Sequence, residues 1–347
     1  MQSNPSRRDF LKLGGLSAAS LAFAPLSSVL SGFDDSNVVR VATTSVSVYR
    51  QPSDESLITG TWYRDDLVHV YEEVVAQEPK FNPVWYRVWG GYMHRARLQR
   101  VKSILSAPLE SIPEGTRRLG EVTIPFTNPW RYTKAYGWEE LGFRLYYESV
   151  HWIEAVEEGP SPGAWYRIYD DLTGFPYLAP ATHLRLIPFE DLEPISPDLP
   201  AQDKRLEVNL TTQTLLAYEN DRVVFQTNIS SGIPYGETDT PRGTFYIDPK
   251  TPSKHMGNGN LFADADDYEL PGVPWTSFFT EAGHAFHGTY WHDNFGSPMS
   301  HGCINMRTNE ARWLFRWSRP SYLVASLLDA GKLREVRGRG TTVEIHY

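Results

Sequence analysis

The sequence contains 347 residues, of which 41% are hydrophobic, and its formal net charge is −9. This length allows two or three packed domains, and an acidic chain without a long basic run argues against a nucleic-acid partner. The single cysteine excludes an intrachain disulfide, whereas the 11 Trp, 19 Tyr and 16 Phe favour β structure.

The N-terminus predicts an exported protein. Residues 6–12 read Ser-Arg-Arg-Asp-Phe-Leu-Lys, close to a twin-arginine signal, and an apolar run follows at 13–30. We assign residues 1–33 to this signal segment and expect the protein in the cell envelope, in the periplasm or the cell wall. Residues 22–24 resemble a cleavage site, but Pro25 would hinder cleavage. The segment is therefore either removed or kept as a membrane anchor.

Two segments, 36–102 and 114–189, repeat one pattern. The tripeptide Trp-Tyr-Arg occurs at 85–87 and again at 165–167, each time among short alternating apolar runs separated by Gly, Pro, Asn and Asp. Such runs predict small antiparallel β-barrels. The pattern resembles bacterial SH3-like modules, which often accompany cell-wall enzymes.

The modules have two interpretations. Their tryptophans could contact glycan or peptide, so that the modules bind the sacculus, or they could form barrel cores in modules that act as spacers. The candidate contacts are Trp62, Trp85, Trp130 and Trp165. Residues 190–202 are rich in Pro and read as a stiff linker. A stiff linker predicts that the following domain acts on small soluble substrates without residues 34–190.

The C-terminal segment, 203–347, opens with alternating runs that predict a strand hairpin, followed by a turn at 240–243. Residues 252–274 are rich in Gly, Asn and Asp and predict a loop over a site. A short helix is expected from Thr308 or Asn309. Its buried face would contain Ala311, Leu314 and Phe315. An added helix is expected within 323–333 and a closing strand within 341–347.

The only cysteine lies in a histidine-rich stretch. Cys303 follows Ser300, His301 and Gly302, and it precedes Asn305, while His287 and Gly288 lie upstream. A thiolate is the attacking species, and a nearby imidazole can take its proton. Without a Cβ, glycines allow the backbone close to a substrate, so the N–H groups of Gly302 and Cys303 could face an oxyanion.

This stretch resembles the signature of the L,D-transpeptidase (YkuD) family, which reads His, a spacer, Ser/Thr-His-Gly-Cys, an aliphatic residue, and Asn or Arg. Residues 240–245 also match the family's Thr-Pro-x-Gly-x-Phe turn. The resemblance covers 203–347 and implies a mainly β protein, with a YkuD-type β-sandwich and a short helix behind the two SH3-like barrels. Residues 319–339 depart from the family's usual short path to the last strand.

The resemblance also implies roles for the site. Cys303 would be the nucleophile, His287 the general base, and the Gly288 carbonyl the group that orients the imidazole. His301 would assist at the oxyanion or substrate. Ser300 and Asn305 would shape the nucleophile turn.

The implied activity is peptidoglycan cross-linking. The cysteine would form a thioester with a stem peptide and transfer it to an amine, without cofactor or metal. Carbapenems would be covalent inhibitors of the same site.

Three alternatives remain open. Transfer to water would make the protein an L,D-carboxypeptidase, and an inactive domain would make it a non-enzymatic wall-binding scaffold. The third is a zinc site, whose spacings match no common zinc motif. Its candidate ligands are His284, His287, His292, Asp293, His301 and Cys303.

Overall fold

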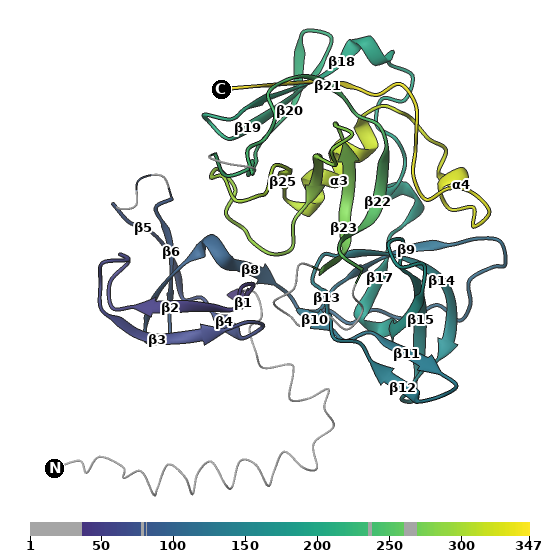
Figure 1. Cartoon of the computed structure of the whole chain (residues 1–347), viewed down its shortest axis with the longest axis horizontal. Coiled ribbons are helices and arrows are strands. Elements are labelled where there is room, and N and C mark those ends of the chain that lie inside the picture. Colours follow the sequence, from purple (N-terminus) through teal and green to yellow (C-terminus); the bar gives the residue numbers. More distant parts are fainter. Residues whose placement is uncertain (1–36, 78–79, 81, 235–237, 260–268) are drawn as a thin grey trace, which may run out of the picture. The chain divides into compact units, whose positions relative to one another are not determined.

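The computed structural model describes residues 37–77, 80, 82–234, 238–259 and 269–347 (Figure 1). The expected signal or membrane anchor, residues 1–33, lies outside this part of the chain. None of the helices in the described ranges has both the length and the apolar character needed to cross a membrane. The described chain is mainly β, with two α-helices.

The first module contains two sheets. One has the order β4-β1-β8 and the other β3-β2-β7-β6-β5. The strands are β1 (Val38–Val41), β2 (Ser45–Tyr49), β3 (Ile58–Tyr63), β4 (Leu67–His69), β5 (Glu72–Val75), β6 (Val84–Val88), β7 (Gly91–His94) and β8 (Leu98–Val101), with a 3-10 turn η3 (Arg95–Arg97) before β8. Alternating apolar side chains of these strands, among them Val39, Val41 and Met93, fill its core.

The second module is built on one seven-stranded sheet, β12-β11-β16-β15-β14-β9-β17, and a β10-β13 pair. Its strands are β9 (Arg118–Val122), β10 (Phe126–Thr127), β11 (Trp130–Thr133), β12 (Gly137–Glu140), β13 (Leu145–Tyr146), β14 (Val150–Glu158), β15 (Ala164–Tyr169), β16 (Pro176–Pro180) and β17 (Leu184–Leu186). No sheet of the described residues closes into a barrel, so the SH3-like assignment stays a prediction.

Burial separates the four candidate tryptophans. Trp85 and Trp165 are buried in their modules, where β-strand cores require large apolar side chains. Both side chains are therefore largely covered by protein, and Trp85 also lies in the wall of a cavity with Tyr49, Asn82 and Ile233. Trp62 and Trp130 are half-buried.

The C-terminal domain packs two sheets around one helix, in agreement with the mainly β class expected for it. The first sheet has the order β20-β19-β18-β26-β21 and the second β22-β23-β24-β25. Their strands are β18 (Lys204–Asn209), β19 (Thr214–Glu219), β20 (Arg222–Asn228), β21 (Gly243–Tyr246), β22 (Lys250–Gly257), β23 (Glu269–Phe278), β24 (Ala285–Gly288), β25 (Ile304–Met306) and β26 (Thr342–His346). Helix α3 (Thr308–Trp317) packs against β22, β23 and β24 (Figure 1).

The helices differ in part from expectation. The buried side of α3 contains Ala311, Leu314 and Phe315, as predicted, but the residue before its first turn is Arg307, whose side chain makes no capping hydrogen bond. The added helix expected within 323–333 is limited to one turn, α4 (Val324–Leu327).

Of the loop expected at 252–274, the two described flanks are strand, and residues 260–268 lie outside the described part of the chain. Residues 252–257 belong to β22 and 269–274 to β23, and Ser253 pairs with Pro274 across them. The polar residues of this segment suggested a loop exposed to water. In the structure, polar side chains such as His255 are instead buried and form ion pairs.

The two modules do not stand apart from the C-terminal domain. Leu119, Val150, Trp152 and Ile187 of the second module belong to the same hydrophobic cluster as the sandwich and α3. The buried Arg117 side chain donates hydrogen bonds to the carbonyls of Leu327, Lys332 and Leu333. Residues 319–339, which depart from the family's usual path to the last strand, therefore connect the second module to the C-terminal domain.

The Pro-rich segment also runs against this domain. The Ile195 N–H donates to the Arg316 carbonyl at 3.0 Å, the Tyr322 hydroxyl donates to the Leu192 carbonyl, and Arg319 donates to the Pro197 carbonyl at 2.6 Å. These contacts fix residues 192–197 along the end of α3, so this part is held in place and is not a free spacer.

A buried histidine joins the second module to β22 and β23. His255 lies 2.6 Å from an Asp170 carboxylate oxygen through Nδ1 and 2.8 Å from Glu269 through Nε2. Burial lowers the pKa of His255, but the two carboxylates outweigh it and raise the pKa above its ordinary value. The imidazolium form therefore bridges the module and the sheet.

This bridge predicts a loss of stability at alkaline pH. A raised pKa in the folded state stabilises the protein fully below the unfolded value, about 6.5, and the gain disappears as pH rises through the folded value. We expect the free energy of unfolding, measured in urea, to fall from pH 6 to pH 9 in the wild type. The same fall should be absent in His255→Asn; an equal fall in both proteins would assign it to other groups.

Candidate active site

The pairing of β24 with β25 brings the signature residues together. The two strands are parallel and place His287 opposite Asn305. Cys303 directly precedes β25 and is partly exposed. The Ser300 side chain accepts from the Gly302 N–H at 3.1 Å and donates to the Cys303 carbonyl. Ser300 therefore lies inside the turn that it was expected to shape.

Gly302 is required at its position for two reasons. Its φ is +110°, a conformation that side chains rarely adopt, and a Cβ would lie 2.7 Å from the His284 ring. Thr240 fixes this glycine from the other side, because its hydroxyl donates to the Gly302 carbonyl at 2.9 Å and accepts from the Gly232 N–H at 2.8 Å. The Thr-Pro-Arg-Gly turn therefore supports the turn at residues 300–303 directly.

The thiol is protonated at rest. Burial raises the pKa of Cys303 above its ordinary value, although the backbone N–H of Ala285 lowers it. The Cys303 Sγ atom lies 3.9 Å from the Gly283 carbonyl. Its hydrogen bonds in the described structure do not include one to His287.

The His287 ring is 2% exposed, and both of its nitrogens have partners. Nδ1 lies 3.0 Å from the Gly288 carbonyl, the contact expected to orient it, and Nε2 lies 3.2 Å from the Asn305 side-chain nitrogen. Burial lowers the pKa of His287 to about 4, while the Gly288 contact raises it. The imidazole is therefore neutral near pH 7, and its acceptor atom, Nε2, takes a hydrogen bond from the Asn305 amide in this structure.

The other expected site residues occupy different environments. His301 is exposed in the turn. The Gly302 N–H, one of the two expected oxyanion donors, is directed to Ser300 in this state. An oxyanion would have to compete with that hydroxyl, so the Cys303 N–H is the less constrained donor of the pair.

The zinc candidates are distributed among separate partners. His284 bonds Thr280, His292 bonds Asn305, and Asp293 accepts from the Arg100 N–H. Within the described ranges, no three His, Cys, Asp or Glu side chains are grouped to hold a metal ion.

Sequence reasoning missed two supporting residues. The buried Gln213 side chain accepts from the Ser231 N–H and donates to the Ser231 hydroxyl, both at 2.8 Å, which fixes the chain next to the turn at residues 300–303. His292, which had been considered only as a metal ligand, is fully buried against Asn305. The pattern offered no signal for Gln213, whereas His292 stands close to His287 in the sequence.

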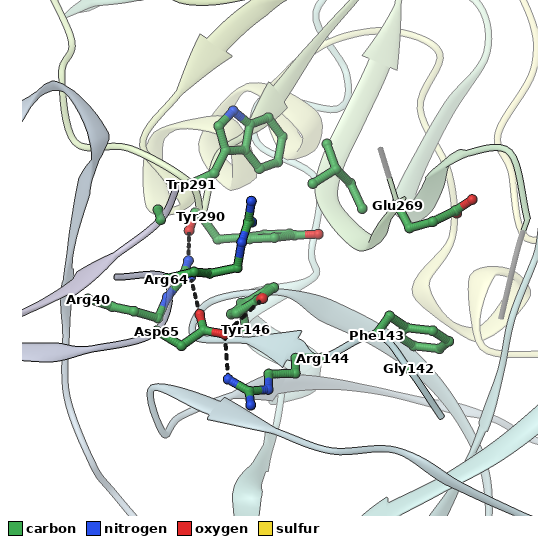
Figure 2. A pocket seen from close by; sticks show the side chains of 12 residues that line it. Arg40, Arg64, Asp65, Gly142, Phe143, Arg144, Tyr146, Glu269, Tyr290 and Trp291 are labelled. Carbon is green, nitrogen blue, oxygen red and sulfur yellow. Dashed lines mark hydrogen bonds and ion pairs between the residues drawn. The ribbon is translucent and has the colours of Figure 1, made fainter. Parts of the chain in front are cut away.

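Two cavities reach residues that contact the site. One, of about 290 Å³, is lined by Arg40, Asp65, Arg144, Tyr146 and Trp291 among others (Figure 2). The Trp291 ring lies 5.6 Å from the His287 ring. The other, of about 730 Å³, includes Gly283, whose carbonyl contacts the Cys303 thiol.

A family comparison agrees with this geometry. Residues 203–345 match the family described as the L,D-transpeptidase catalytic domain, YkuD. A protein of Bacillus subtilis (strain 168) named YciB, which its name assigns provisionally to the L,D-transpeptidases, is 25% identical over 130 residues. That alignment covers 34% of this chain and 63% of the relative, so the chain spans less than two thirds of the relative's length.

Solved structures give further likenesses. A mutant L,D-transpeptidase of Enterococcus faecium is 26% identical and aligns over 42% of this chain and 50% of its own, with a TM-score of 0.31. The LD transpeptidase LdtMt1 in complex with imipenem is 16% identical and aligns over 71% and 95%, with a TM-score of 0.32. The family match supports a YkuD-type catalytic domain in residues 203–345.

Proposed function

We propose, starting from the YkuD-type domain of residues 203–345, that this protein is a peptidoglycan L,D-transpeptidase with Cys303 as its nucleophile. The observation that carries the proposal is a partly exposed thiol beside a strand pair that holds a buried, neutral His287. This pairing supplies a nucleophile and a proton acceptor. An intact pair of this kind disfavours the wall-binding scaffold.

The reaction has two acyl transfers. The Cys303 sulfur attacks the carbonyl carbon between an L-centre and a D-centre of a stem peptide while His287 takes the thiol proton. The C–N bond then breaks, His287 returns the proton to the leaving amine of the terminal D-residue, and a thioester remains. An amine of a neighbouring stem attacks the thioester, the C–S bond breaks, and the thiol regains its proton.

The two substrates need separate approaches to one thioester. The cavity at Trp291 and the cavity at Gly283 offer two such approaches, because each contains a residue in contact with one member of the catalytic pair. We assign these cavities to the two stem peptides.

The protonation states predict an unusual pH profile. Since the pKa of His287 is lowered to about 4, the free enzyme keeps a proton acceptor far below the ordinary histidine range. We expect kcat/KM on a small stem peptide to stay level between pH 5.5 and 7.5 and to fall only near pH 4. A fall centred near pH 6.5 would contradict a neutral, buried base.

The proposal includes the place of action and two further partners. The twin-arginine-like segment at 6–12 supports export to the cell envelope, where the modules would attach the enzyme to the sacculus. The imipenem complex of a structurally similar transpeptidase supports carbapenems as covalent inhibitors. A sedimentation assay with sacculi, comparing wild type with Trp62→Ala and Trp130→Ala, tests the attachment.

The function is tested on purified disaccharide-peptides with four-residue stems. Mass spectrometry should detect cross-linked dimers that have lost one terminal D-residue. If only shortened monomers form while a large excess of amine acceptor is present, the acceptor is water and the enzyme is an L,D-carboxypeptidase. If neither product forms, the proposal is wrong.

A further inference from the structure

A chain of four hydrogen bonds links His287 to backbone groups on both sides of the active site. We propose that His292 is a positioning residue for His287, that it acts through Asn305, and that the first module fixes the loop on which it lies. This inference rests on the proposed function of His287 as the base. It names residues that fix the tautomer of His287 with its lone pair on Nε2, the atom that exchanges the Asn305 hydrogen bond for the thiol proton.

The direction of each hydrogen bond follows from the two ends of the chain. The Gly288 carbonyl can only accept, so the Nδ1 of His287 carries the proton. The Asn294 N–H can only donate, and its acceptor is the Nδ1 of His292 at 3.2 Å. In the neutral ring the His292 proton therefore lies on Nε2.

The middle of the chain fits this assignment without conflict. The His292 Nε2–H donates to the Asn305 side-chain oxygen at 3.0 Å, and the Asn305 side-chain nitrogen donates to the Nε2 of His287 at 3.2 Å. If Asn305 were flipped, two donors would face each other at one end. The chain thus selects one tautomer for both histidines and one orientation for the amide.

Burial and charge keep His292 in the form that this chain needs. Both rings are almost fully buried. Burial lowers the pKa of His292 to about 4, against a raising contact from Asn305, and the nearby Arg97 and Arg95 lower it further. A protonated His292 would place a second donor against the Asn294 N–H. The four hydrogen bonds can therefore form together only while His292 is neutral.

Residues of the first module form hydrogen bonds with both ends of the loop 290–294, which carries His292. At one end of the loop, Arg40 donates to the Tyr290 carbonyl at 2.8 Å and pairs with Asp65 (Figure 2). The Gln99 side chain also accepts from the Arg40 guanidinium. At the other end, Arg95 donates to the Asn294 side chain at 3.2 Å. The Asp293 N–H donates to the Leu98 carbonyl.

The C-terminal domain holds the same loop from within. The Ser230 hydroxyl donates to the Asn294 carbonyl at 3.0 Å, and the Gly296 N–H donates to the Ile229 carbonyl. The loop therefore lies between β8 of the first module and the end of β20. Loss of the contacts to the first module would shift Asn294, whose backbone N–H is the first donor in the chain of hydrogen bonds.

The matched variants are His292→Leu, which removes both ring nitrogens, and His292→Gln, which retains a donor for Asn305. His292→Leu should lower kcat/KM by about 10-fold to 100-fold, part of what a positioned acid–base group contributes, and should change kcat more than KM. His292→Gln should recover most of this loss.

If His292 only stabilised the fold, its replacement would not shift the acid limb of the pH profile of kcat/KM. A hydrogen bond donated to Nε2 favours the neutral imidazole, so its loss should raise the pKa of His287. We therefore expect the acid limb of kcat/KM to shift to higher pH in His292→Leu and to stay in place in His292→Gln. A folded His292→Leu protein with wild-type kcat/KM and acid limb would overturn the proposal.

The module contact has its own pair of variants. Arg95→Ala should also reduce kcat/KM, but only by about 3-fold to 10-fold. This is a smaller part of what a positioned acid–base group contributes to the rate. Arg87→Ala is the control, because that side chain pairs with Glu72 on an exposed strand of the same module. Equal kcat/KM values for the two variants would show that the first module does not position the site.

One measurement needs neither turnover nor variants. ¹⁵N NMR of the histidine rings in the full chain at pH 7 should show His287 protonated at Nδ1 and His292 at Nε2. The opposite tautomer at either ring would overturn the proposal even if the enzyme cross-links stem peptides. The expected tautomers in a protein without transpeptidase activity would leave the chain intact and refute only the proposed function.

Discussion

Replacing Cys303 by alanine is expected to abolish turnover on stem peptides while the protein keeps its fold. The side chain is small and only partly buried, so little packing is lost, whereas the attacking atom is removed. The loss should exceed about 10³-fold, because the atom proposed to form the acyl-enzyme is removed. Steady-state kinetics with wild type and variant, together with their thermal midpoints, check both parts of this expectation.

The same variant supports a chemical test of the nucleophile. A carbapenem presents a strained amide, whose opening by the Cys303 sulfur leaves a covalent adduct. Intact mass spectrometry should show one adduct per wild-type chain, peptide mapping should place it on the Cys303 peptide, and the alanine variant should show none. Labelling of a serine would refute Cys303 as the nucleophile.

Removing residues 34–190 is expected to destroy the C-terminal domain, contrary to the expectation from the Pro-rich linker. The deletion would expose the partners of Leu119, Val150, Trp152 and Ile187 in the shared hydrophobic cluster. Each such side chain contributes roughly 1.5–3 kcal/mol when buried. Their sum is comparable to the whole stability of a typical domain, about 5–15 kcal/mol.

The deletion also removes the partners of one charged side chain and of two backbone carbonyls. His255 loses Asp170, and the carbonyls of Leu327 and Leu333 lose Arg117. We expect the truncated protein to be insoluble or to lack a cooperative unfolding transition by circular dichroism. A shorter deletion, of residues 34–102, serves as the comparison, because it spares the shared cluster and should leave a folded protein with reduced kcat/KM. A fully active protein lacking 34–190 would show that the shared cluster is dispensable.

The sequence offered clearer predictions for the candidate site than for the architecture. A local signature sufficed to select Cys303, His287 and Gly288, because these residues are close in sequence and the turn needs glycine at 302. The structure adds the strand pairing that sets Asn305 beside His287. The strand hairpin that opens the domain and the last strand, β26, were also evident from alternation.

What the sequence could not show depends on long-range partners. Residues 252–257 looked like a loop because their polar side chains hide the strand, and only Asp170, far away in the chain, explains a buried His255. The separation of the modules was inferred from prolines, yet the segment around Leu192 is fixed by contacts to α3 and Tyr322. Such contacts leave no periodic pattern to read.

Strand β26 constrains the order in which the domain can form. It lies between β18 and β21 and runs parallel to β18, with Leu206 opposite Val343 and Phe245 also opposite Val343 on the other side. Residues 342–346 leave the ribosome after every other strand of this sheet, so β18 and β21 stay unpaired along these edges until residues 342–346 have emerged. Pairing across more than 130 positions of sequence is slow, since the chain must close a long loop first. The nascent catalytic domain therefore needs protection from edge-to-edge association during this interval.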